Sequence, residues 1–111
     1  MSGPNSIHGS IDFLDYEFQA ECNVPCRIRF ANGQIQVTWE QDGRGTRRET
    51  VEYIGTVTNS EHYELECPGH RGKATLHRFP GAQVLVGDLF HEGQRGMWRI
   101  CLFPAQVGGD E

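Results

Sequence analysis

Long hydrophobic runs are missing from this sequence, and signals for helices are scarce. Apolar residues make up only 37% of the 111 residues, whereas glycine occurs 14 times. No stretch reaches the roughly 20 apolar residues that a membrane-spanning helix needs. The first residues, MSGPNSIHGSIDF, also lack the basic segment and following apolar run of a secretory signal. We therefore expect a soluble, cytoplasmic protein with no membrane partner.

Positive charge and catalytic motifs are lacking as well. The 10 Lys and Arg residues are outnumbered by 15 Asp and Glu residues, which gives a net charge of −5. Surfaces that bind nucleic acid need clustered basic side chains to neutralise phosphates, so we expect no nucleic-acid partner. The sequence contains no G-x-S-x-G, P-loop, H-E-x-x-H or G-x-G-x-x-G motif. These absences favour a non-enzymatic protein, although they do not exclude catalysis.

The chain does contain apolar and polar residues that alternate with a period of two. Eight such runs are rich in β-branched and aromatic residues, and turn-forming residues separate adjacent runs. The low apolar content fits strands that are buried on one face only. The runs are residues 11–22, 26–31, 34–41, 49–58, 62–67, 73–79, 83–90 and 97–103. In the seventh run both faces carry apolar residues, so its register stays open.

Two hairpins near the N-terminus have a predicted register. The pair Asn32-Gly33 is typical of a two-residue hairpin turn. This turn sets Phe30 opposite Ile35, Ile28 opposite Val37 and Cys26 opposite Trp39. A second turn, at residues 23–25, is predicted to set Cys22 opposite Cys26, both inward, and Glu21 opposite Arg27.

Eight short strands joined by short turns predict an all-β fold, an antiparallel up-and-down meander. Closing the meander into a small barrel removes its unpaired edges, so we expect an eight-stranded barrel. The alternative is an open or split sheet with a peripheral first strand. We expect the barrel domain to span residues 11–104, with flexible tails at 1–10 and 105–111.

The closing stretch VLVGDLFHEGQRGMWRICL, residues 84–102, combines glycine and aromatic residues in a hairpin. It resembles the hairpins of the compact calycin barrels, avidin-like and lipocalin-like. The likeness is one of architecture over most of the chain, and it implies an up-and-down barrel. The lipocalin Gly-x-Trp near the start and the polar residues that avidins use for biotin are missing, so the resemblance implies neither function.

The predicted inward face carries no Asp, Glu, Lys or Arg across the first six strands. One interpretation is a barrel filled by its own side chains. The other is a cup for an apolar or planar ligand, which would stack on Trp39 or Trp98. A tyrosine hydroxyl, from Tyr16 or Tyr53, would then orient the ligand.

Alternate turns of a meander emerge at the same end of the barrel. The turns at 23–25, 41–48, 68–72 and 91–96 should therefore share one rim, and those at 31–33, 59–61 and 80–82 the other. The first rim collects basic residues, namely Arg44, Arg47, Arg48, His70, Arg71, His91 and Arg95. The second collects Glu61 and no basic residue. A basic rim favours an anion or an acidic protein surface as partner, although polar loops are also ordinary. The ligand-binding candidates at this rim are Arg47, Arg48, Arg71 and Arg95.

The cysteines have spacings that fit a metal site. Cys22 and Cys26 form C-x3-C, Cys67 and His70 form C-x2-H, and both pairs are expected at the first rim. Thiolates and imidazoles bind Zn²⁺ in a tetrahedron, so Cys22, Cys26, Cys67 and His70 are a candidate zinc site. Free inward thiols and a Cys22–Cys26 disulfide remain alternatives.

These patterns predict a small non-enzymatic binding barrel with an aromatic cup and a basic rim. Its ligand would be a small apolar or anionic molecule. The alternative is a protein-interaction or accessory domain that uses the barrel as a scaffold, with a structural zinc at one rim.

Overall fold

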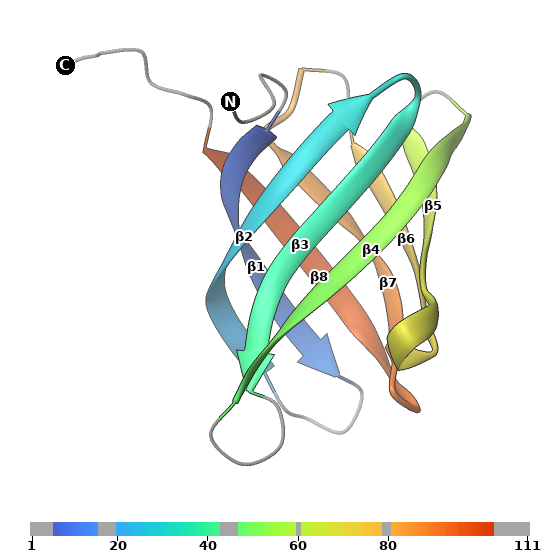
Figure 1. The fold of residues 1–111 in the computed structure, drawn as a ribbon. Helices are drawn as coiled ribbons and strands as arrows, with labels where there is room; N and C mark the ends of the chain where they lie inside the picture. The colour runs from blue at the N-terminus through green and yellow to red at the C-terminus, as the bar shows by residue number, and fades with distance from the viewer. Residues whose placement is uncertain (1–5, 16–19, 43–46, 60, 79–80, 104–111) are drawn as a thin grey trace, which may run out of the picture.

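The computed structural model describes residues 6–15, 20–42, 47–59, 61–78 and 81–103. Eight antiparallel strands follow one another around a closed barrel, and β1 pairs with β8 to close it (Figure 1). The strands are β1 (Ser6–Asp15), β2 (Ala20–Ala31), β3 (Gln34–Asp42), β4 (Arg48–Asn59), β5 (His62–Cys67), β6 (Gly72–Arg78), β7 (Val84–His91) and β8 (Gln94–Phe103). A short 3₁₀ turn, η1 (Pro68–His70), joins β5 to β6. The predicted up-and-down barrel is confirmed, and the open sheet is excluded.

β1 begins at Ser6, earlier than the expected start at residue 11. The added segment pairs with β2 on one side and β8 on the other. Gly9 lies there because the strands come very close: a Cβ at this position would lie 2.5 Å from the carbonyl oxygen of Cys101. A glycine among short polar residues hides the alternation, so this part of the strand gave no signal in the sequence.

The hairpin of β2 and β3 has the predicted register. Phe30 pairs with Ile35, Ile28 with Val37 and Cys26 with Trp39. Both turn residues have positive φ, 55° for Asn32 and 77° for Gly33, as a two-residue turn of this kind requires. The apolar pairs therefore meet on the inner face of the barrel.

The predicted turn at residues 23–25 is wrong, because these residues lie within β2. Ile11 pairs with Val24 but Phe13 pairs with Glu21, so Asp12 alone faces both Cys22 and Asn23. This is a β-bulge, and the extra residue in β2 shifts the alternation of its faces. Asn23 has a φ of 60°, and its N–H donates a 3.0 Å hydrogen bond to Oδ1 of Asp12.

The bulge places the two N-terminal cysteines in different surroundings. Cys26 is buried, whereas Cys22 is exposed. The predicted Cys22–Cys26 and Glu21–Arg27 pairs are wrong because all four residues lie in the single strand β2, and Arg27 pairs with His8 of β1 instead. The alternation in the sequence is locally correct, but it cannot show the insertion of one residue.

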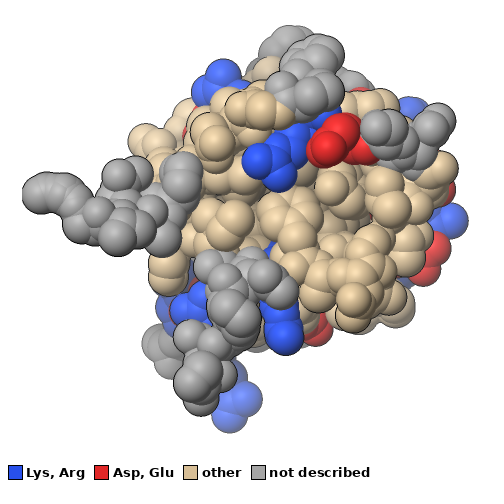
Figure 2. Space-filling model, turned by 90° about the horizontal axis from the view of Figure 1, so that it is seen from above, with Lys and Arg blue, Asp and Glu red and all other residues tan. Residues whose placement is uncertain are grey.

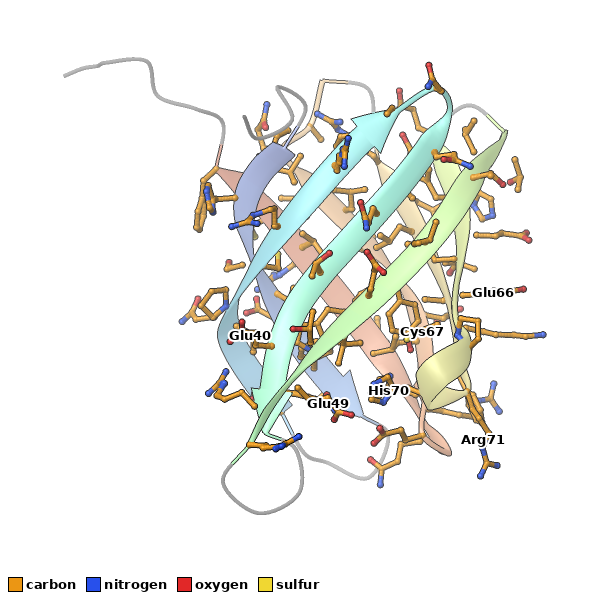
Figure 3. The ribbon with its side chains drawn as sticks, viewed as in Figure 1. Glu40, Glu49, Glu66, Cys67, His70 and Arg71 are labelled. Atoms are coloured by element: carbon orange, nitrogen blue, oxygen red, sulfur yellow. The ribbon has the colours of Figure 1, made fainter. Side chains whose placement is uncertain are left out.

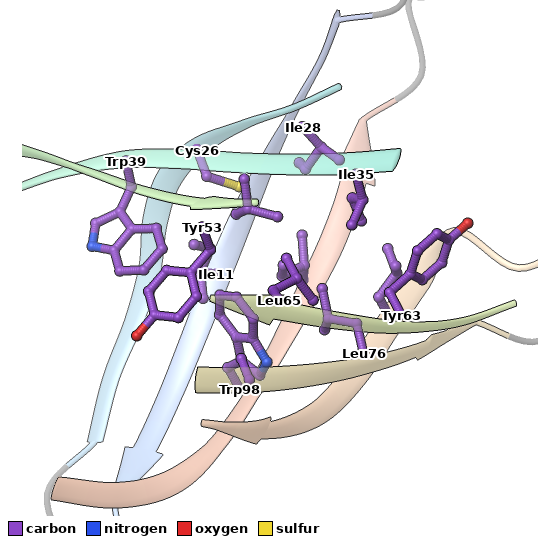
Figure 4. Packing of buried hydrophobic residues seen from close by; sticks show 14 of the residues in the cluster. Ile11, Cys26, Ile28, Ile35, Trp39, Tyr53, Tyr63, Leu65, Leu76 and Trp98 are labelled. Atoms are coloured by element: carbon purple, nitrogen blue, oxygen red, sulfur yellow. The ribbon is translucent and has the colours of Figure 1, made fainter. Parts of the chain in front are cut away.

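Side chains fill the middle of the barrel (Figure 4). Among the described residues the buried cluster is wholly hydrophobic. It includes the fully buried side chains Ile11, Ile28, Ile35, Val37, Val51, Tyr53, Leu65, Leu76, Leu85, Trp98 and Ile100. Full burial of one such aliphatic side chain contributes about 1.5–3 kcal/mol. The cluster thus supplies the main driving force for closing the barrel.

β7 resolves the register that the sequence left open. Leu85 is buried and Leu89 packs against the core, whereas Val84 and Val86 lie on the outer face and are exposed. His91, at the end of β7, shares the inward alternation of Leu85 and Leu89 and is largely buried.

Among the described residues no helix is long and apolar enough to cross a bilayer.

Candidate functional site

One end of the barrel, the lower end in Figure 1, gathers segments that are far apart in the sequence. The end of β3, the start of β4, η1 and the turn between β7 and β8 all lie there. The N–H of Glu92, in the β7–β8 turn, donates a 3.0 Å hydrogen bond to the carbonyl of His70 in η1. The predicted sharing of one rim by these turns is confirmed. We call this end the mouth.

Four aromatic rings pack together just inside the mouth. Trp39 and Tyr53 stack with centroids 5.6 Å apart and planes 11° apart. Trp98 meets Tyr53 at 5.5 Å and Trp39 at 6.0 Å, and Phe13 meets Trp39 at 5.3 Å. Figure 4 shows Trp39, Tyr53 and Trp98 at one end of the core and Tyr63 at the other. The predicted aromatic group of Trp39, Tyr53 and Trp98 is therefore assembled, as the inner floor of the mouth.

The hydroxyl of Tyr53 connects this floor to the mouth. It lies 2.8 Å from Nδ1 of His91 and 3.3 Å from the carbonyl oxygen of Phe90. Burial raises the pKa of Tyr53, so the phenol stays protonated and donates a hydrogen bond to the carbonyl oxygen of Phe90. Gly72 leaves the space that the hydroxyl needs, because a Cβ there would lie 2.0 Å from the hydroxyl oxygen.

Two histidines and two glutamates lie above the aromatic floor. His70 stacks on His91 with centroids 5.0 Å apart and planes 21° apart. Nδ1 of His70 is hydrogen-bonded to Oε2 of Glu92, and Nε2 of His70 lies 3.7 Å from Oε2 of Glu49. Figure 3 shows His70 turned into the mouth beside Glu49, while Arg71 points away from it. His70 is thus held between two carboxylates.

His91 is the most enclosed member of this group. Burial is the main cause that lowers the pKa of His91, so its imidazole is neutral at pH 7. Its Nε2 lies 3.8 Å from Oε2 of Glu92, which is too far for a hydrogen bond. This Nε2 is buried and has no hydrogen-bond partner among the described residues. The pKa of Glu92 is lowered, chiefly by its hydrogen bond with His70, so this carboxylate stays ionised at pH 7.

A hollow of about 400 Å³ opens at the mouth beside His91. Its apolar lining comes from Phe13, Leu14, Val24, Trp39, Leu89 and Met97. Its polar lining comes from Glu21, Glu40, Gln41, Gln94 and Arg95. The volume lies within the range of about 300–1,000 Å³ typical of ligand pockets. A larger hollow, of about 710 Å³, lies on the outer face of β4–β8, away from the aromatic floor.

The predicted basic residues do not form a common site. Arg95 lines the hollow, Arg48 lies 3.6 Å from Glu40, and Arg47 and Arg71 are exposed. Tyr16 and Arg44 lie outside the described residues. Glu40, Glu49 and Glu92 stand among these cations, so the rim is mixed in charge.

The opposite end of the barrel has a basic residue close to it, Arg78, at the end of β6 and outside the turns considered in the sequence. The N–H of Arg78 donates a 2.9 Å hydrogen bond to the carbonyl of Glu61, and its guanidinium lies 5.5 Å from the centroid of the Phe30 ring. Figure 2, which views this end from above, shows Lys and Arg as well as Asp and Glu. A cation of β6 therefore lies beside the turn residue Glu61, and the prediction from turn residues alone did not include it.

The predicted zinc residues Cys22, Cys26, Cys67 and His70 are not brought together. Cys22 is exposed on the outer face, Cys26 and Cys67 are buried, and all four cysteines are free thiols. Within the described part of the chain, one group of at least three His, Cys, Asp or Glu residues has its potential ligand atoms within 4.8 Å of one another. That group is His70, His91 and Glu92.

Sequence reasoning placed His70 and His91 at one rim, but it did not single out Glu92 or group the three residues as ligands. His91 and Glu92 belong to the turn HEGQRG, which the meander places at the same rim as His70. That shared rim was the available signal. The ambiguous register of β7 concealed that His91 points inward.

The chain matches no family model, no curated protein and no solved structure. Its class is therefore defined by its own fold and site. It is a closed, eight-stranded, antiparallel up-and-down β-barrel with an aromatic floor and a histidine–glutamate group at one mouth.

Proposed function

We propose that this protein is a small non-enzymatic binding barrel of the calycin type, whose ligand occupies the hollow at the mouth. The observation that carries the proposal is the hollow of about 400 Å³, with apolar walls and a few polar groups at its edge. Because side chains fill the middle of the barrel, the ligand would lie at the mouth and not deep inside.

The lining indicates the class of ligand. Phe13, Leu89 and Met97 offer apolar surface that water still reaches, so a ligand that covers it gains hydrophobic free energy. Glu21 and Glu40 stand at the edge, and Arg95 is the one cation of the lining among the described residues. We therefore expect a flat, neutral or weakly cationic organic molecule to be preferred over an anion.

The proposal is tested with two fluorescent probes of similar shape and different charge. The neutral N-phenyl-1-naphthylamine should bind saturably, and the anionic 1-anilinonaphthalene-8-sulfonate more weakly. Met97→Glu should weaken the binding of the neutral probe by about tenfold, which corresponds to about 1.4 kcal/mol.

The matched control is Ile54→Glu. Met97 and Ile54 are similarly exposed, 45% and 47%. Ile54 does not line the hollow at the mouth but lines the larger hollow on the outer face of the barrel. The control variant should bind the probe as the wild type does. Absence of saturable binding, or an equal loss in both variants, would contradict the proposal.

A second candidate is an interaction domain, and a separate observation favours it. Val84, Val86 and Phe103 expose 37%, 38% and 55% of their surface on the outer face of β7 and β8. Exposed apolar surface of this kind can serve protein contacts. Sedimentation velocity at increasing concentration should then detect self-association that Val86→Lys abolishes. A monomer at every concentration would argue against self-association through this face.

The proposed location is the cytoplasm. The four free cysteines support it, because thiols persist in reducing compartments.

A further inference from the structure

Three potential metal ligands converge at the mouth. Nδ1 of His70 is hydrogen-bonded to Oε2 of Glu92, and Nε2 of His91 lies 3.8 Å from the same oxygen. The potential ligand atoms of the three residues all lie within 4.8 Å of one another. We propose that His70, His91 and Glu92 bind a divalent transition metal of the Zn²⁺ type. This site goes beyond the proposed binding of an organic ligand and does not depend on it.

The second nitrogen of His91 is hydrogen-bonded, and the second nitrogen of His70 faces a carboxylate beyond hydrogen-bond distance. Nδ1 of His91 lies 2.8 Å from the Tyr53 hydroxyl, and Nε2 of His70 lies 3.7 Å from the Glu49 carboxylate. Histidines that ligate metals commonly have the other ring nitrogen bonded to a carboxylate or another polar group. The nitrogens left for the metal are Nε2 of His91 and Nδ1 of His70, and both face Glu92.

An unsatisfied atom supports the same assignment. Nε2 of His91 is buried and, among the described residues, has no hydrogen-bond partner. Buried polar atoms without partners are rare in folded proteins and call for an explanation. A metal bound to this lone pair satisfies it.

The backbone holds the ligands close enough for small side-chain movements to complete the site. The hydrogen bond from the Glu92 N–H to the His70 carbonyl fixes η1 against the β7–β8 turn. Tetrahedral bonds of about 2.0–2.1 Å place ligand atoms about 3.3 Å apart. Nε2 of His91 must therefore move slightly closer to Glu92, whereas the hydrogen-bonded atoms of His70 and Glu92 must move slightly apart to admit the ion. The metal replaces the proton between His70 and Glu92, and this proton passes to solvent.

The donor set indicates the kind of metal. Two imidazole nitrogens and one carboxylate oxygen suit Zn²⁺ and related ions, and not Ca²⁺ or Mg²⁺, which prefer oxygen ligands. Three protein ligands leave a fourth position open. Of the three residues, His91 also lines the hollow at the mouth.

Calorimetric titration of the chelator-treated protein with Zn²⁺ tests the proposal. We expect saturable binding of one ion per chain, no comparable binding of Mg²⁺, and a loss of affinity of at least about tenfold in His70→Gln and in Glu92→Gln. The side chain of Glu92 is 52% exposed, so Glu92→Gln should fold normally. Thermal melts without metal verify this.

The other histidine pair of the barrel provides the matched control. His62 and His77 lie on β5 and β6 with their Nδ1 atoms 3.0 Å apart, near Glu64. The double variant with His62→Gln and His77→Gln should keep the affinity of the wild type. Loss of binding in this control, or unchanged affinity in both His70→Gln and Glu92→Gln, would overturn the proposal. A thiolate-to-metal absorption band in the Co²⁺ complex would overturn it too, because it would place the ion on cysteine.

Discussion

The hydroxyl of Tyr53 lies 2.8 Å from Nδ1 of His91, although 38 positions separate the two residues in the sequence. Tyr53 is fully buried and stacks on Trp39, whereas His91 borders the hollow at the mouth. The contact therefore joins the packed core to the candidate site. The position of the His91 ring therefore depends on the packing of Tyr53 in the core.

Removing this hydroxyl should affect both stability and metal binding. In Tyr53→Phe the buried Nδ1 of His91 loses its partner, so we expect the free energy of unfolding to fall by about 1–3 kcal/mol. If the metal proposal holds, Zn²⁺ affinity should fall by about 10–100-fold, as for other partners of ligating histidines. Urea unfolding and calorimetry measure the two effects. Tyr63→Phe, at the other end of the core, should leave Zn²⁺ affinity unchanged; an equal loss in both variants would show that the effect is not local.

Space for the Tyr53 hydroxyl can be tested through two glycines near η1. A Cβ at Gly72 would lie 2.0 Å from the hydroxyl oxygen, whereas a Cβ at Gly69 would meet nothing within 4 Å. We expect Gly72→Ala to lower the free energy of unfolding by about 1–3 kcal/mol through overpacking. Gly69→Ala, a control nearby in the chain, should change it by less than about 1 kcal/mol. Similar urea midpoints for the two variants would contradict the close approach.

The contacts of Asp12 at the bulge in β2 should make the free energy of unfolding depend on pH in the acidic range. The hydrogen bond from the Asn23 N–H, followed by that from the Arg99 guanidinium, lowers the pKa of Asp12 below its ordinary value. A lowered carboxyl pKa contributes stability above the unfolded pKa, about 3.9, that is lost as pH falls through the folded pKa. Urea midpoints measured from pH 6 to pH 2 should therefore fall more steeply below about pH 4 for the wild type than for Asp12→Asn. Parallel curves would show that Asp12 makes no such contribution.

The cysteines should differ in reactivity because the bulge separates them. Cys22 is exposed, whereas burial raises the pKa of Cys26 to about 12 and keeps it as an unreactive thiol at pH 8. With a disulfide reagent at pH 8, the native protein should show a fast phase that Cys22→Ser removes. Cys26→Ser should retain the fast phase. Equal reaction rates for both thiols would indicate that Cys22 and Cys26 are similarly exposed, which would contradict the structure.

The limits of the sequence pattern are clearest where one residue changes the register. The turn at Asn32-Gly33 was predictable because its conformation is local, and it fixes every pair from Cys26–Trp39 to Phe30–Ile35. The bulge opposite Asp12 was not predictable, because it is defined by the pairing of β2 with β1 and by a hydrogen bond between residues 11 positions apart. That one difference moved Cys22 out of the predicted zinc site.

The candidate site was predictable only in part for the same reason. The topology placed His70 and His91 at one rim, and the alternation of β3, β4 and β8 placed Trp39, Tyr53 and Trp98 inward. The inward direction of His91 depended on β7, where apolar residues occupy both faces. Packing against the core selects Leu85 and Leu89 for the inside, and His91 follows them.

By itself the sequence determined the all-β class, the number and order of the strands and the hairpin at residues 32–33. These follow from the period of two and from turn residues, which act over a few positions. Only the tertiary structure decided closure through β1 and β8, the bulge in β2 and the grouping of His70, His91 and Glu92. Each of these depends on contacts between segments far apart in the chain, whose free energy comes from packing that no local pattern records.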